Sequence, residues 1–477
     1  MDNSLTPNTP LCVDLDGTLI RTDLLLESVL VLLKCNPLYL FRLPWWLARG
    51  RAHLKREIAL RVKVDIDTLP FDSRVLELLR NAQCQQPILL CTASDKVLAD
   101  AVATHVGGFE GVLASDGKHN LSGHRKASTL VSTYGEKGFD YAGNEARDLA
   151  IWRHARRAFV VNASRVVVAR ASEVSEIADI FPREPAGWRP WLKALRVHQW
   201  LKNILVFVPL LAAHLALEPI AAIRAIATFV IFSLCASGVY ILNDLFDLGA
   251  DRRHPRKQKR PFASGQIPLA AGIAVAPALT LIAFVAAWFL APRLALVLLG
   301  YYVLTIGYSL KLKQVVMLDV LVLAILYTLR IIGGAVAIGV DNSFWLLAFS
   351  MFLFFSLAML KRYTELNMLI ENAERSVSGR GYRVEDIALL QSLGGASGYL
   401  SVLVLALYIN SNASAALYRS PQFLWLLCPL LLYWISRVWI IAHRGLMHDD
   451  PVVFAARDRS SLITLALCVI VVILAML

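Results

Sequence analysis

The sequence predicts a multi-domain protein in which an α/β domain is followed by an all-α membrane domain of nine transmembrane helices. Its 57% hydrophobic content and mean hydropathy of +0.56 exceed those of an ordinary soluble enzyme. After about residue 186, nine apolar runs are long enough to cross a bilayer. Before residue 182, short apolar segments alternate with helical stretches, as a parallel sheet requires.

Composition narrows the possible partners. The chain has 48 basic and 36 acidic residues, a net charge of +12. Many basic residues cluster beside the apolar runs, which fits membrane loops and anionic phosphate ligands better than nucleic acid. We therefore expect no nucleic-acid partner. The seven cysteines have no paired spacing and argue for neither zinc nor disulfides. The first ten residues lack the pattern of a signal peptide, so we expect the leading domain to stay in the cytosol.

The first predicted strand runs directly into a pair of carboxylates. Leu11–Val13 is apolar and is followed by Asp14-Leu15-Asp16-Gly17-Thr18. Open α/β sheets bind ligands at the carboxyl ends of their strands, where one carboxylate can attack phosphorus while the next handles protons. A later segment ends in Thr92-Ala93-Ser94, whose hydroxyls could hold a phosphoryl group. The further predicted strands lie at residues 87–91, 111–114 and 157–161.

The region of residues 10–182 resembles the haloacid dehalogenase superfamily of phosphatases, whose members have a Rossmann-like α/β domain. The DxDGT signature carries the resemblance, and its companion motifs follow in the family's order. The resemblance implies that Asp14 is the nucleophile that becomes phosphorylated and Asp16 the general acid/base. It makes Thr92 the hydroxyl of the second motif, and Lys126 the charge that holds nucleophile and phosphate together.

The same resemblance implies a Mg²⁺ site made by Asp14, Asp16, Asn144 and Asp148. Asn144 stands where the family has its first metal-binding aspartate. An amide oxygen can bind Mg²⁺ but brings no charge. A weakly active or mainly structural domain is therefore the alternative to an active phosphatase.

An insert of helical character, about residues 23–83, interrupts the α/β pattern. A helical cap is common at this position in the family, and we interpret the apolar, tryptophan-rich stretch Leu38–Leu47 as cap core. The alternative is that this stretch lies on the bilayer surface. Its apolar runs are too short, and too often interrupted by polar residues and proline, to span a membrane.

A proline-rich junction at residues 183–194 predicts a linker that reaches the membrane interface. The membrane domain would then occupy residues 195–477. Nine spans put its two ends on opposite sides, so a cytosolic first domain places the most basic loops in the cytosol, as the positive-inside rule requires. We expect a multi-pass protein of the inner (cytoplasmic) membrane with its active sites on the cytoplasmic side. The nine runs lie near residues 199–216, 222–246, 268–290, 294–310, 317–340, 343–360, 395–411, 422–441 and 461–477.

Three carboxylates stand where the second run meets water. In Asn243-Asp244-Leu245-Phe246-Asp247-Leu248-Gly249-Ala250-Asp251, the aspartates lie at i, i+3 and i+7, on one face of a helix. Hard oxygen ligands suit Mg²⁺, and the basic run that follows, including Lys257 and Arg260, would meet the remaining phosphate charge. The alternative is an ordinary charged helix end at a membrane interface.

Further ionisable residues fall at the same predicted face. Asp449 and Asp450 lie in the last cytoplasmic loop, and Asp319 lies near the cytoplasmic end of the fifth run. Arg330 lies two to three turns deeper, where an arginine can hold a polar head group in an apolar pocket. The alternative for Arg330 is a simple pair with a neighbouring carboxylate.

The membrane domain resembles the UbiA superfamily of intramembrane prenyltransferases. The NDxxDxxxD pattern of residues 243–251, the downstream Arg260-Pro261 and the nine spans carry the resemblance. It implies a Mg²⁺ and phosphate site made by Asn243, Asp244, Asp247 and Asp251. The second acidic motif of the aromatic-prenylating members is not evident, because its expected region holds only residues 361–365, Lys-Arg-Tyr-Thr-Glu.

Other stretches resemble one branch of that superfamily, the polyprenyl-phosphate phosphoribosyltransferases. They are residues 195–203, residues 308–313 with Lys311, and Leu318-Asp319 with Leu329-Arg330. The resemblance implies phosphoribosyl diphosphate as donor and a polyprenyl phosphate as acceptor. The product would carry a ribose 5-phosphate, which the fused phosphatase would remove. Two alternatives stay open: prenyl transfer from a polyprenyl diphosphate to an aromatic or other acceptor, and a non-enzymatic lipid carrier with a regulatory domain.

Overall fold

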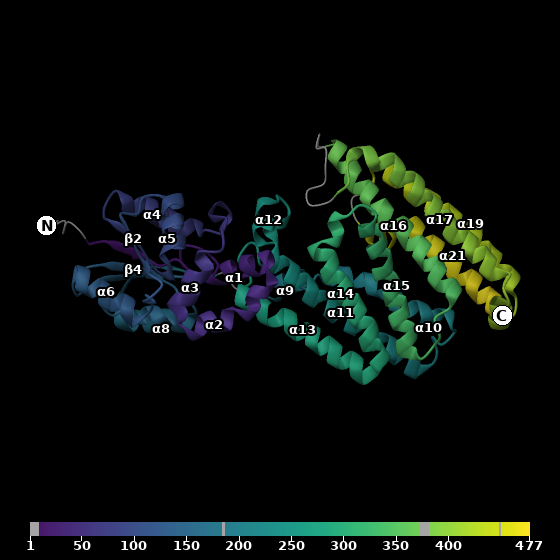
Figure 1. The fold of residues 1–477 in the computed structure, drawn as a ribbon, viewed down its shortest axis with the longest axis horizontal. Coiled ribbons are helices and arrows are strands. Elements are labelled where there is room, and N and C mark those ends of the chain that lie inside the picture. The colour runs from purple at the N-terminus through teal and green to yellow at the C-terminus, as the bar shows by residue number, and fades with distance from the viewer. Residues whose placement is uncertain (1–8, 184–186, 372–380, 448–449) are drawn as a thin grey trace. The chain divides into compact units, whose positions relative to one another are not determined.

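The computed structural model describes residues 9–183, 187–371, 381–447 and 450–477 of the 477-residue chain (Figure 1). The chain divides into two compact units. The first comprises the chain up to Leu195 together with Tyr240–Ala276, and the second comprises Arg196–Val239 with Pro277–Leu477. The acidic motif therefore belongs to the same unit as the α/β sheet.

The sheet of the first unit is entirely parallel and has the order β3-β2-β1-β4-β5-β6. β1 is central, with Cys12 opposite Leu89 on one side and Tyr141 on the other. The parallel sheet is confirmed, but β4 and β6 were not predicted: β4 is a four-residue DYAG segment, and β6 is a largely exposed edge strand. The strands are β1 Leu11–Val13, β2 Ile88–Asp95, β3 Gly111–Ser115, β4 Asp140–Gly143, β5 Arg157–Val161 and β6 Glu176–Phe181.

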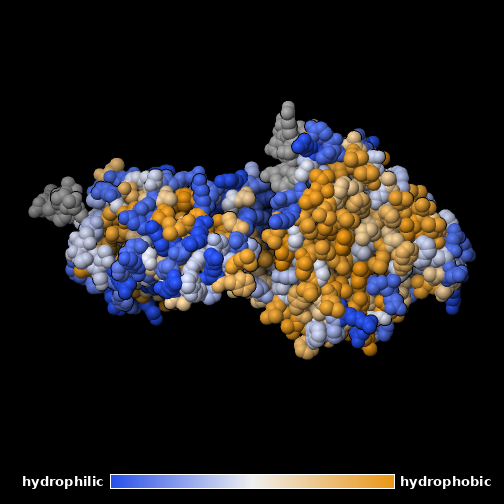
Figure 2. Space-filling model, viewed as in Figure 1, coloured by the Kyte–Doolittle hydropathy of each residue, from blue (hydrophilic) through white to orange (hydrophobic). Residues whose placement is uncertain are grey.

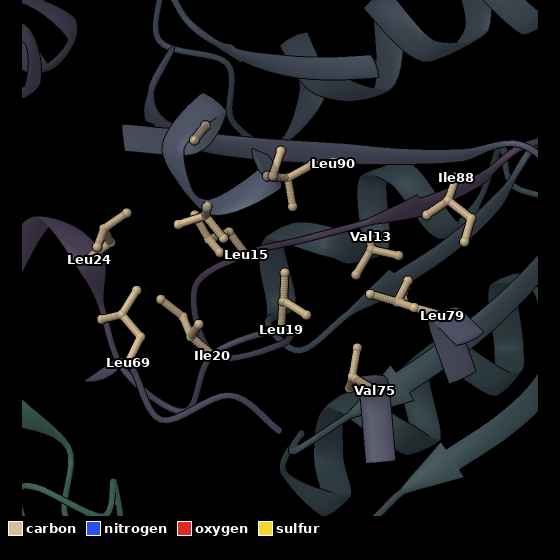
Figure 3. Close-up of a cluster of buried hydrophobic side chains, with 14 of the residues drawn as sticks. Val13, Leu15, Leu19, Ile20, Leu24, Leu69, Val75, Leu79, Ile88 and Leu90 are labelled. Carbon is tan, nitrogen blue, oxygen red and sulfur yellow. The ribbon is translucent and has the colours of Figure 1, made fainter. Parts of the chain in front are cut away.

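Each face of the sheet has its own apolar core. Leu11 and Val13 point to one face and Cys12 to the other, because side chains alternate along a strand. Figure 3 shows the first core, where Val13 of the sheet lies beside Leu79 and Leu90 belongs to the same cluster. The helices around the sheet are α4 Ser73–Gln83, α5 Lys96–Val106, α6 His124–Tyr134, η3 Ala146–Asp148, α7 Leu149–Trp152 and α8 Arg165–Val174.

The helical insert forms a small core of its own. Leu32, Trp46 and Ile58 are buried together, so the interpretation as cap core holds for Trp46. It does not hold for Trp45, which is 57% exposed beside it. The insert consists of α1 Leu24–Cys35, η1 Pro37–Phe41, α2 Leu43–Ala48, α3 Arg51–Ala59 and η2 Ile66–Thr68.

Eight helices of the described chain are long and apolar enough to cross a membrane. Figure 2 shows apolar residues over much of the visible face of these helices. Large side chains such as Phe289, 83% exposed, face outward, as lipid contact requires. The protein is an integral membrane protein. The eight segments are α11 Pro219–Phe246, α13 Leu269–Leu290, α14 Pro292–Leu310, α15 Leu318–Ile338, α16 Phe344–Glu371, α17 Ile387–Ile409 with η7 Val384–Asp386, α19 Leu427–His443 with η8 Pro421–Leu426, and α21 Arg459–Met476.

Eight of the nine predicted spans correspond to these long apolar helices. The stretch predicted at 199–216 is a shorter apolar segment, Val197–Ala212, made of η4 Val197–Phe207 and α10 Val208–Ala212. Residues with positive φ, Arg196 and His214, bracket it, and Pro209 lies where its winding changes. The orientation inferred from an odd number of spans therefore does not follow from the eight long helices alone. The remaining short elements are α9 Trp188–Ala194, α12 Leu248–Arg253, η5 Lys257–Lys259, η6 Leu312–Gln314, α18 Asn412–Leu417 and α20 Pro451–Ala455.

Candidate functional site

Asp14 and Lys126 form an ion pair at the carboxyl end of β1. Lys126 lies in the first turn of α6, and its Nζ is 2.9 Å from Asp14 Oδ1. The same Nζ donates to the Tyr141 hydroxyl at 2.9 Å and to the Cys91 carbonyl at 3.1 Å. Burial opposes the charge of Lys126, but the charges of Asp14 and Asp148 outweigh it and raise its pKa. The lysine is thus a fixed positive charge beside a carboxylate at the strand end.

Asp16 is held by the start of the cap helix and by the second strand. Its Oδ1 accepts from the Leu24 N–H at 2.7 Å, and its Oδ2 accepts from Ser94 Oγ at 2.8 Å. Burial and the neighbouring charge of Asp23 raise the pKa of Asp16 to about 7, which suits a group that gives and takes a proton near neutrality. Thr92 is buried, and its Oγ1 accepts from the Ser94 N–H at 3.0 Å.

The loop after β4 brings Asn144 and Asp148 to the same place. Asp148 Oδ2 accepts from the N–H groups of Asn144 and Glu145, each at 2.9 Å. Burial and the charge of Asp14 raise the pKa of Asp148 to about 6. Asn144 Oδ1 is buried without a hydrogen-bond partner among the described residues. Such an orphaned oxygen costs about 1–3 kcal/mol, and a Mg²⁺ ion would satisfy it, so the donor set fits that metal.

A lysine of the cap insert also enters this site. Lys55 of α3 donates to Asn120 Oδ1 at 3.0 Å and to the carbonyl of Ala93, between Thr92 and Ser94. Burial lowers the pKa of Lys55, while the charge of Asp16 opposes that shift. Lys55 could not be singled out from the sequence, because cap helices carry many exposed lysines and only the fold shows which one is buried.

Two aspartates of the acidic motif share one arginine. Arg260 Nη1 lies 3.0 Å from Asp244 Oδ1 and 2.6 Å from Asp251 Oδ2. Both aspartates are buried; burial raises the pKa of Asp251, and the charge of Arg260 opposes the shift. Two carboxylates that share one guanidinium lie within reach of one cation. Mg²⁺ commonly takes one or two carboxylates plus phosphate oxygens, so this pair fits it.

Asp247 has a different partner. It lies at the break between α11 and α12, with φ −103° and ψ 14°, and its Oδ1 is 2.8 Å from Lys34 Nζ. The structure therefore brings Asp244 and Asp251 together, whereas Asp247 forms an ion pair with Lys34 of the cap helix α1. Across the described ranges, no group of three or more His, Cys, Asp or Glu side chains is placed to hold a metal. A Mg²⁺ ion at either site would therefore need other oxygens as well, such as the Asn144 amide oxygen or those of a phosphate.

Three other residues proposed from the sequence lie at the ends of helices. Asn243 is half-buried one residue before Asp244, Lys257 is exposed at the start of η5, and Lys311 is exposed at the end of α14. The positions of these three residues do not by themselves show what each of them would bind.

Asp319 is fully buried and saturated by partners. Its Oδ2 is 2.5 Å from Arg362 Nε, and its Oδ1 accepts from the Tyr382 hydroxyl at 2.6 Å. Because both oxygens are occupied, this contact ties α15 to α16 and to the segment before α17. The geometry favours a structural role for Asp319 over the substrate-binding role expected from the sequence.

Arg330 is buried among neutral groups. Its guanidinium donates to Asn203 Oδ1 at 2.7 Å, to the Tyr301 hydroxyl at 3.1 Å and to the Leu326 carbonyl. No carboxylate of the described chain pairs with it, which argues against the simple ion pair considered above. Its Cζ lies 5.6 Å from the centre of the Tyr327 ring. A buried positive charge with only neutral partners is suited to an anionic ligand.

A second basic group lies at the same ring. Lys202 Nζ is 5.9 Å from the centre of the Tyr327 ring and 2.8 Å from Asp450 Oδ2. Lys361 Nζ approaches the same oxygen at 2.9 Å. Burial opposes ionisation of Asp450, but the two lysines outweigh it and lower its pKa. Asp449 lies outside the described residues. Neither lysine was singled out from the sequence, although Lys202 interrupts an apolar run, where ionisable residues are costly and usually functional.

The first unit also contains a cavity of about 560 Å³ beside the α/β site. Asp16, Asn144 and Asn162 line one part of it, and Ser264–Gln266 and Pro268–Ala270, which follow the acidic motif, line another. Gly265 has φ +75°, and a Cβ there would lie 2.7 Å from the Arg21 carbonyl oxygen. This close approach fixes the segment against the α/β part of its unit.

Fold and site together define a polytopic membrane enzyme that carries an α/β region with a paired-carboxylate site. The chain belongs to the UbiA prenyltransferase family, whose model matches residues 204–457. It is 37% identical over 456 residues to the uncharacterized protein y4nM of Sinorhizobium fredii, an alignment that covers 95% of this chain and 88% of the relative. It is 38% identical over 274 residues to the nodulation protein NoeC of Azorhizobium caulinodans, covering 57% of this chain and 89% of NoeC.

The chain is also related to the decaprenyl-phosphate phosphoribosyltransferase of Mycobacterium tuberculosis. The two are 36% identical over 181 residues, which is 37% of this chain and 60% of the relative. Among solved structures, a UbiA homolog from Archaeoglobus fulgidus bound to GPP and Mg²⁺ aligns with 59% of this chain and 99% of its own, with a TM-score of 0.45 and 15% identity. A substrate-bound phosphoserine phosphatase aligns with 38% of this chain and 95% of its own, with a TM-score of 0.27 and 12% identity.

Proposed function

We propose that the protein transfers a phosphoribosyl group from phosphoribosyl diphosphate to a polyprenyl phosphate, and that the α/β region then removes the ribose 5-phosphate. The reaction would need Mg²⁺ and would take place on the cytoplasmic side of the inner membrane. The observation that carries the transferase step is the buried guanidinium of Arg330, which has only neutral partners and shares the Tyr327 ring with Lys202. The relationship to decaprenyl-phosphate phosphoribosyltransferase supports the same assignment.

In the transferase step, an oxygen of the lipid phosphate attacks C1 of the ribose as the bond from C1 to the diphosphate breaks. Asp244 and Asp251 would hold a Mg²⁺ ion, which supplies charge stabilisation to the departing diphosphate. Asp247, the third carboxylate of the motif, would complete the metal site when the donor binds, and Asn243, Lys257 and Arg260 would bind oxygens of the donor. In the second unit, Arg330 and the two lysines around Asp450 would bind the phosphate of the lipid.

In the phosphatase step, Asp14 attacks the phosphorus of the ribose 5-phosphate. The bond from phosphorus to the ribose oxygen breaks, and Asp16 gives that oxygen its proton. Water then attacks the aspartyl phosphate, Asp16 takes a proton back, and inorganic phosphate leaves. Lys126, 2.9 Å from Asp14, balances the charge that builds up on the phosphoryl oxygens.

Two features support an active phosphatase over a purely structural domain. Asp16 has a pKa of about 7, and Asn144 presents an orphaned oxygen to the site. The cavity beside Asp16 is lined in part by Ser264–Gln266, which follow the acidic motif. That lining supports a substrate that both activities share.

The test is an assay of purified protein in detergent with Mg²⁺, labelled phosphoribosyl diphosphate and a polyprenyl phosphate. The wild type should form labelled lipid that carries ribose without its 5-phosphate. Asp247→Asn should abolish labelling, and Asp14→Asn should accumulate the 5-phosphorylated lipid. Asp116→Asn, a change at an exposed aspartate of the α/β region, is the matched control.

Absence of labelled lipid from folded protein would refute phosphoribosyl transfer. Prenyl diphosphates with aromatic acceptors would then be the substrates to try. A lipid carrier would tolerate Asp247→Asn, whereas the proposed transferase should not. Membership of an enzyme family already favours catalysis over carriage.

A further inference from the structure

The cap insert exposes an unusual number of large apolar side chains. Five of the ten residues from Leu38 to Leu47 are large, apolar and at least half exposed. A soluble domain rarely leaves such a contiguous patch open unless something binds it. The exposed fractions are 68% for Leu38, 57% for Leu40, 78% for Phe41, 57% for Trp45 and 50% for Leu47.

These exposed side chains belong to a part of the insert that is folded and packed. Trp46 of the same helix, α2, is only 3% exposed and packs with Leu32 and Ile58. Of the two adjacent tryptophans, Trp46 therefore belongs to the cap core and Trp45 lies on the surface. The core contacts hold the insert in place, and its exposed side chains form an aromatic and aliphatic surface.

The charged residues within this stretch of the sequence all have one sign. Between Asn36 and Arg56 the sequence contains no acidic residue. Arg49 lies over the Trp45 ring at 3.7 Å, and Arg42 lies over the Tyr39 ring at 5.6 Å. Arginines whose stems and guanidinium groups cover aromatic rings can keep their charge at a polar boundary while the rings enter an apolar phase.

We propose that residues 37–51, here called the cap face, dock on the anionic surface of the lipid bilayer. Segments that lie in a membrane interface have this composition: aromatic and aliphatic side chains beside basic residues. The cap face has such side chains beside arginines and contains no acidic residue. The eight long apolar helices of the same chain make a bilayer a permanent neighbour. A second copy of the cap face is a poor occupant, because symmetric pairing would bring like charges together.

The docking would bring a phosphatase to a substrate that stays in the membrane. η1 and α2 are short, each contains a proline, Pro37 or Pro44, and Arg42 lies between them, so the cap face would lie on the bilayer and not cross it. Lys55 of α3, in the same insert, reaches the α/β site. This inference does not depend on phosphoribosyl transfer, because any lipid-linked phosphate ester would be presented in the same way.

The experiment places an environment-sensitive fluorophore on the cap face of the full-length protein in lipid nanodiscs. Cys35 and Cys84, the exposed cysteines of the described chain, are changed to Ser, and Phe41→Cys is labelled. The matched control keeps Cys84 as the labelled site and carries Cys35→Ser. Spin-labelled lipids serve as quenchers, in nanodiscs with and without anionic lipid.

If the cap face docks on the bilayer, quenching should be several-fold stronger at position 41 than at Cys84. It should also be stronger when anionic lipid is present. Arg42→Gln with Arg49→Gln should reduce that difference without changing the circular dichroism spectrum. Equal quenching at the two positions would overturn the proposal. So would a bright probe at position 41 that lipid quenchers do not reach, because the cap face would then contact protein.

Discussion

Glu27 and Arg252 form a two-pronged ion pair across 225 positions of the sequence. Arg252 Nη1 and Nη2 donate to the two carboxylate oxygens of Glu27 at 2.9 and 2.7 Å. The pair is almost fully buried within the first unit. It ties the cap helix α1 to the segment after the acidic motif, and the first N–H of α1, from Leu24, also holds Asp16.

Breaking this pair should destabilise the first unit strongly. Glu27→Gln would leave the Arg252 charge buried without a counter-charge, at a cost of about 3–5 kcal/mol. Glu57→Gln, which breaks a partly exposed pair with Arg61, is the control and should cost no more than about 1 kcal/mol. Unfolding by denaturant in detergent measures both. Equal midpoints for the two variants would contradict the structural importance of the buried pair.

Gly265→Ala should also be destabilising. The backbone there has φ +75°, and a new Cβ would lie 2.7 Å from the Arg21 carbonyl oxygen, which costs about 1–3 kcal/mol. Gly249→Ala is the matched control, because its Cβ meets nothing within 4 Å and alanine favours the helix by up to about 1 kcal/mol. Thermal unfolding midpoints should fall for the first variant and hold or rise for the second. A wild-type midpoint for Gly265→Ala would refute the close approach.

Stability at acid pH should depend on Asp72. Burial opposes ionisation of Asp72, but hydrogen bonds from Arg74 and Asn162 and the charge of Arg21 outweigh it and hold its pKa well below the usual value. Its contribution is therefore fully present above the unfolded-state pKa, near 4, and is lost as pH falls below that value. Asp72→Asn should destabilise at pH 7 and flatten the loss of stability between roughly pH 4 and 2. An unchanged acid profile would contradict this.

Arg330→Met should weaken binding of the lipid phosphate. Loss of hydrogen bonds from a charged group costs about 1.5–3 kcal/mol, so the KM for polyprenyl phosphate should rise about ten- to a hundred-fold. The KM for phosphoribosyl diphosphate should change much less. Arg293→Gln, at the exposed start of α14, should leave both constants unchanged. A selective loss of affinity for the diphosphate donor would reassign Arg330.

Asn144→Asp should tighten Mg²⁺ binding in the α/β site. The orphaned amide oxygen would become a charged ligand, and each added carboxylate strengthens a site for a hard cation. Titration of Mg²⁺ against hydrolysis of a small soluble phosphate ester should give half-maximal activity at a lower metal concentration. Gln85→Glu, an equal charge change on the exposed turn after α4, is the control. A weaker metal response would show that Asn144 is not a ligand.

Much of the architecture could be predicted because it depends on local properties. Apolar length located the eight long membrane helices, and alternating short segments predicted the parallel sheet. The edge strand Glu176–Phe181 was not predicted, because most of its residues are exposed and it lacks a continuous apolar run. The first apolar run, predicted at 199–216, is the shorter segment Val197–Ala212, because hydropathy does not report where a helix ends or changes its winding.

The sequence by itself determined which groups the candidate sites contain: the Asp14 and Asp16 pair, Lys126, and the three aspartates of the acidic motif. Only the tertiary structure decided their partners. It assigned Asp247 to Lys34 while Asp244 and Asp251 share Arg260, and it buried Trp46 beside an exposed Trp45. The physical reason is that helical periodicity fixes which residues share a face, whereas the element that covers that face is brought there by the rest of the fold.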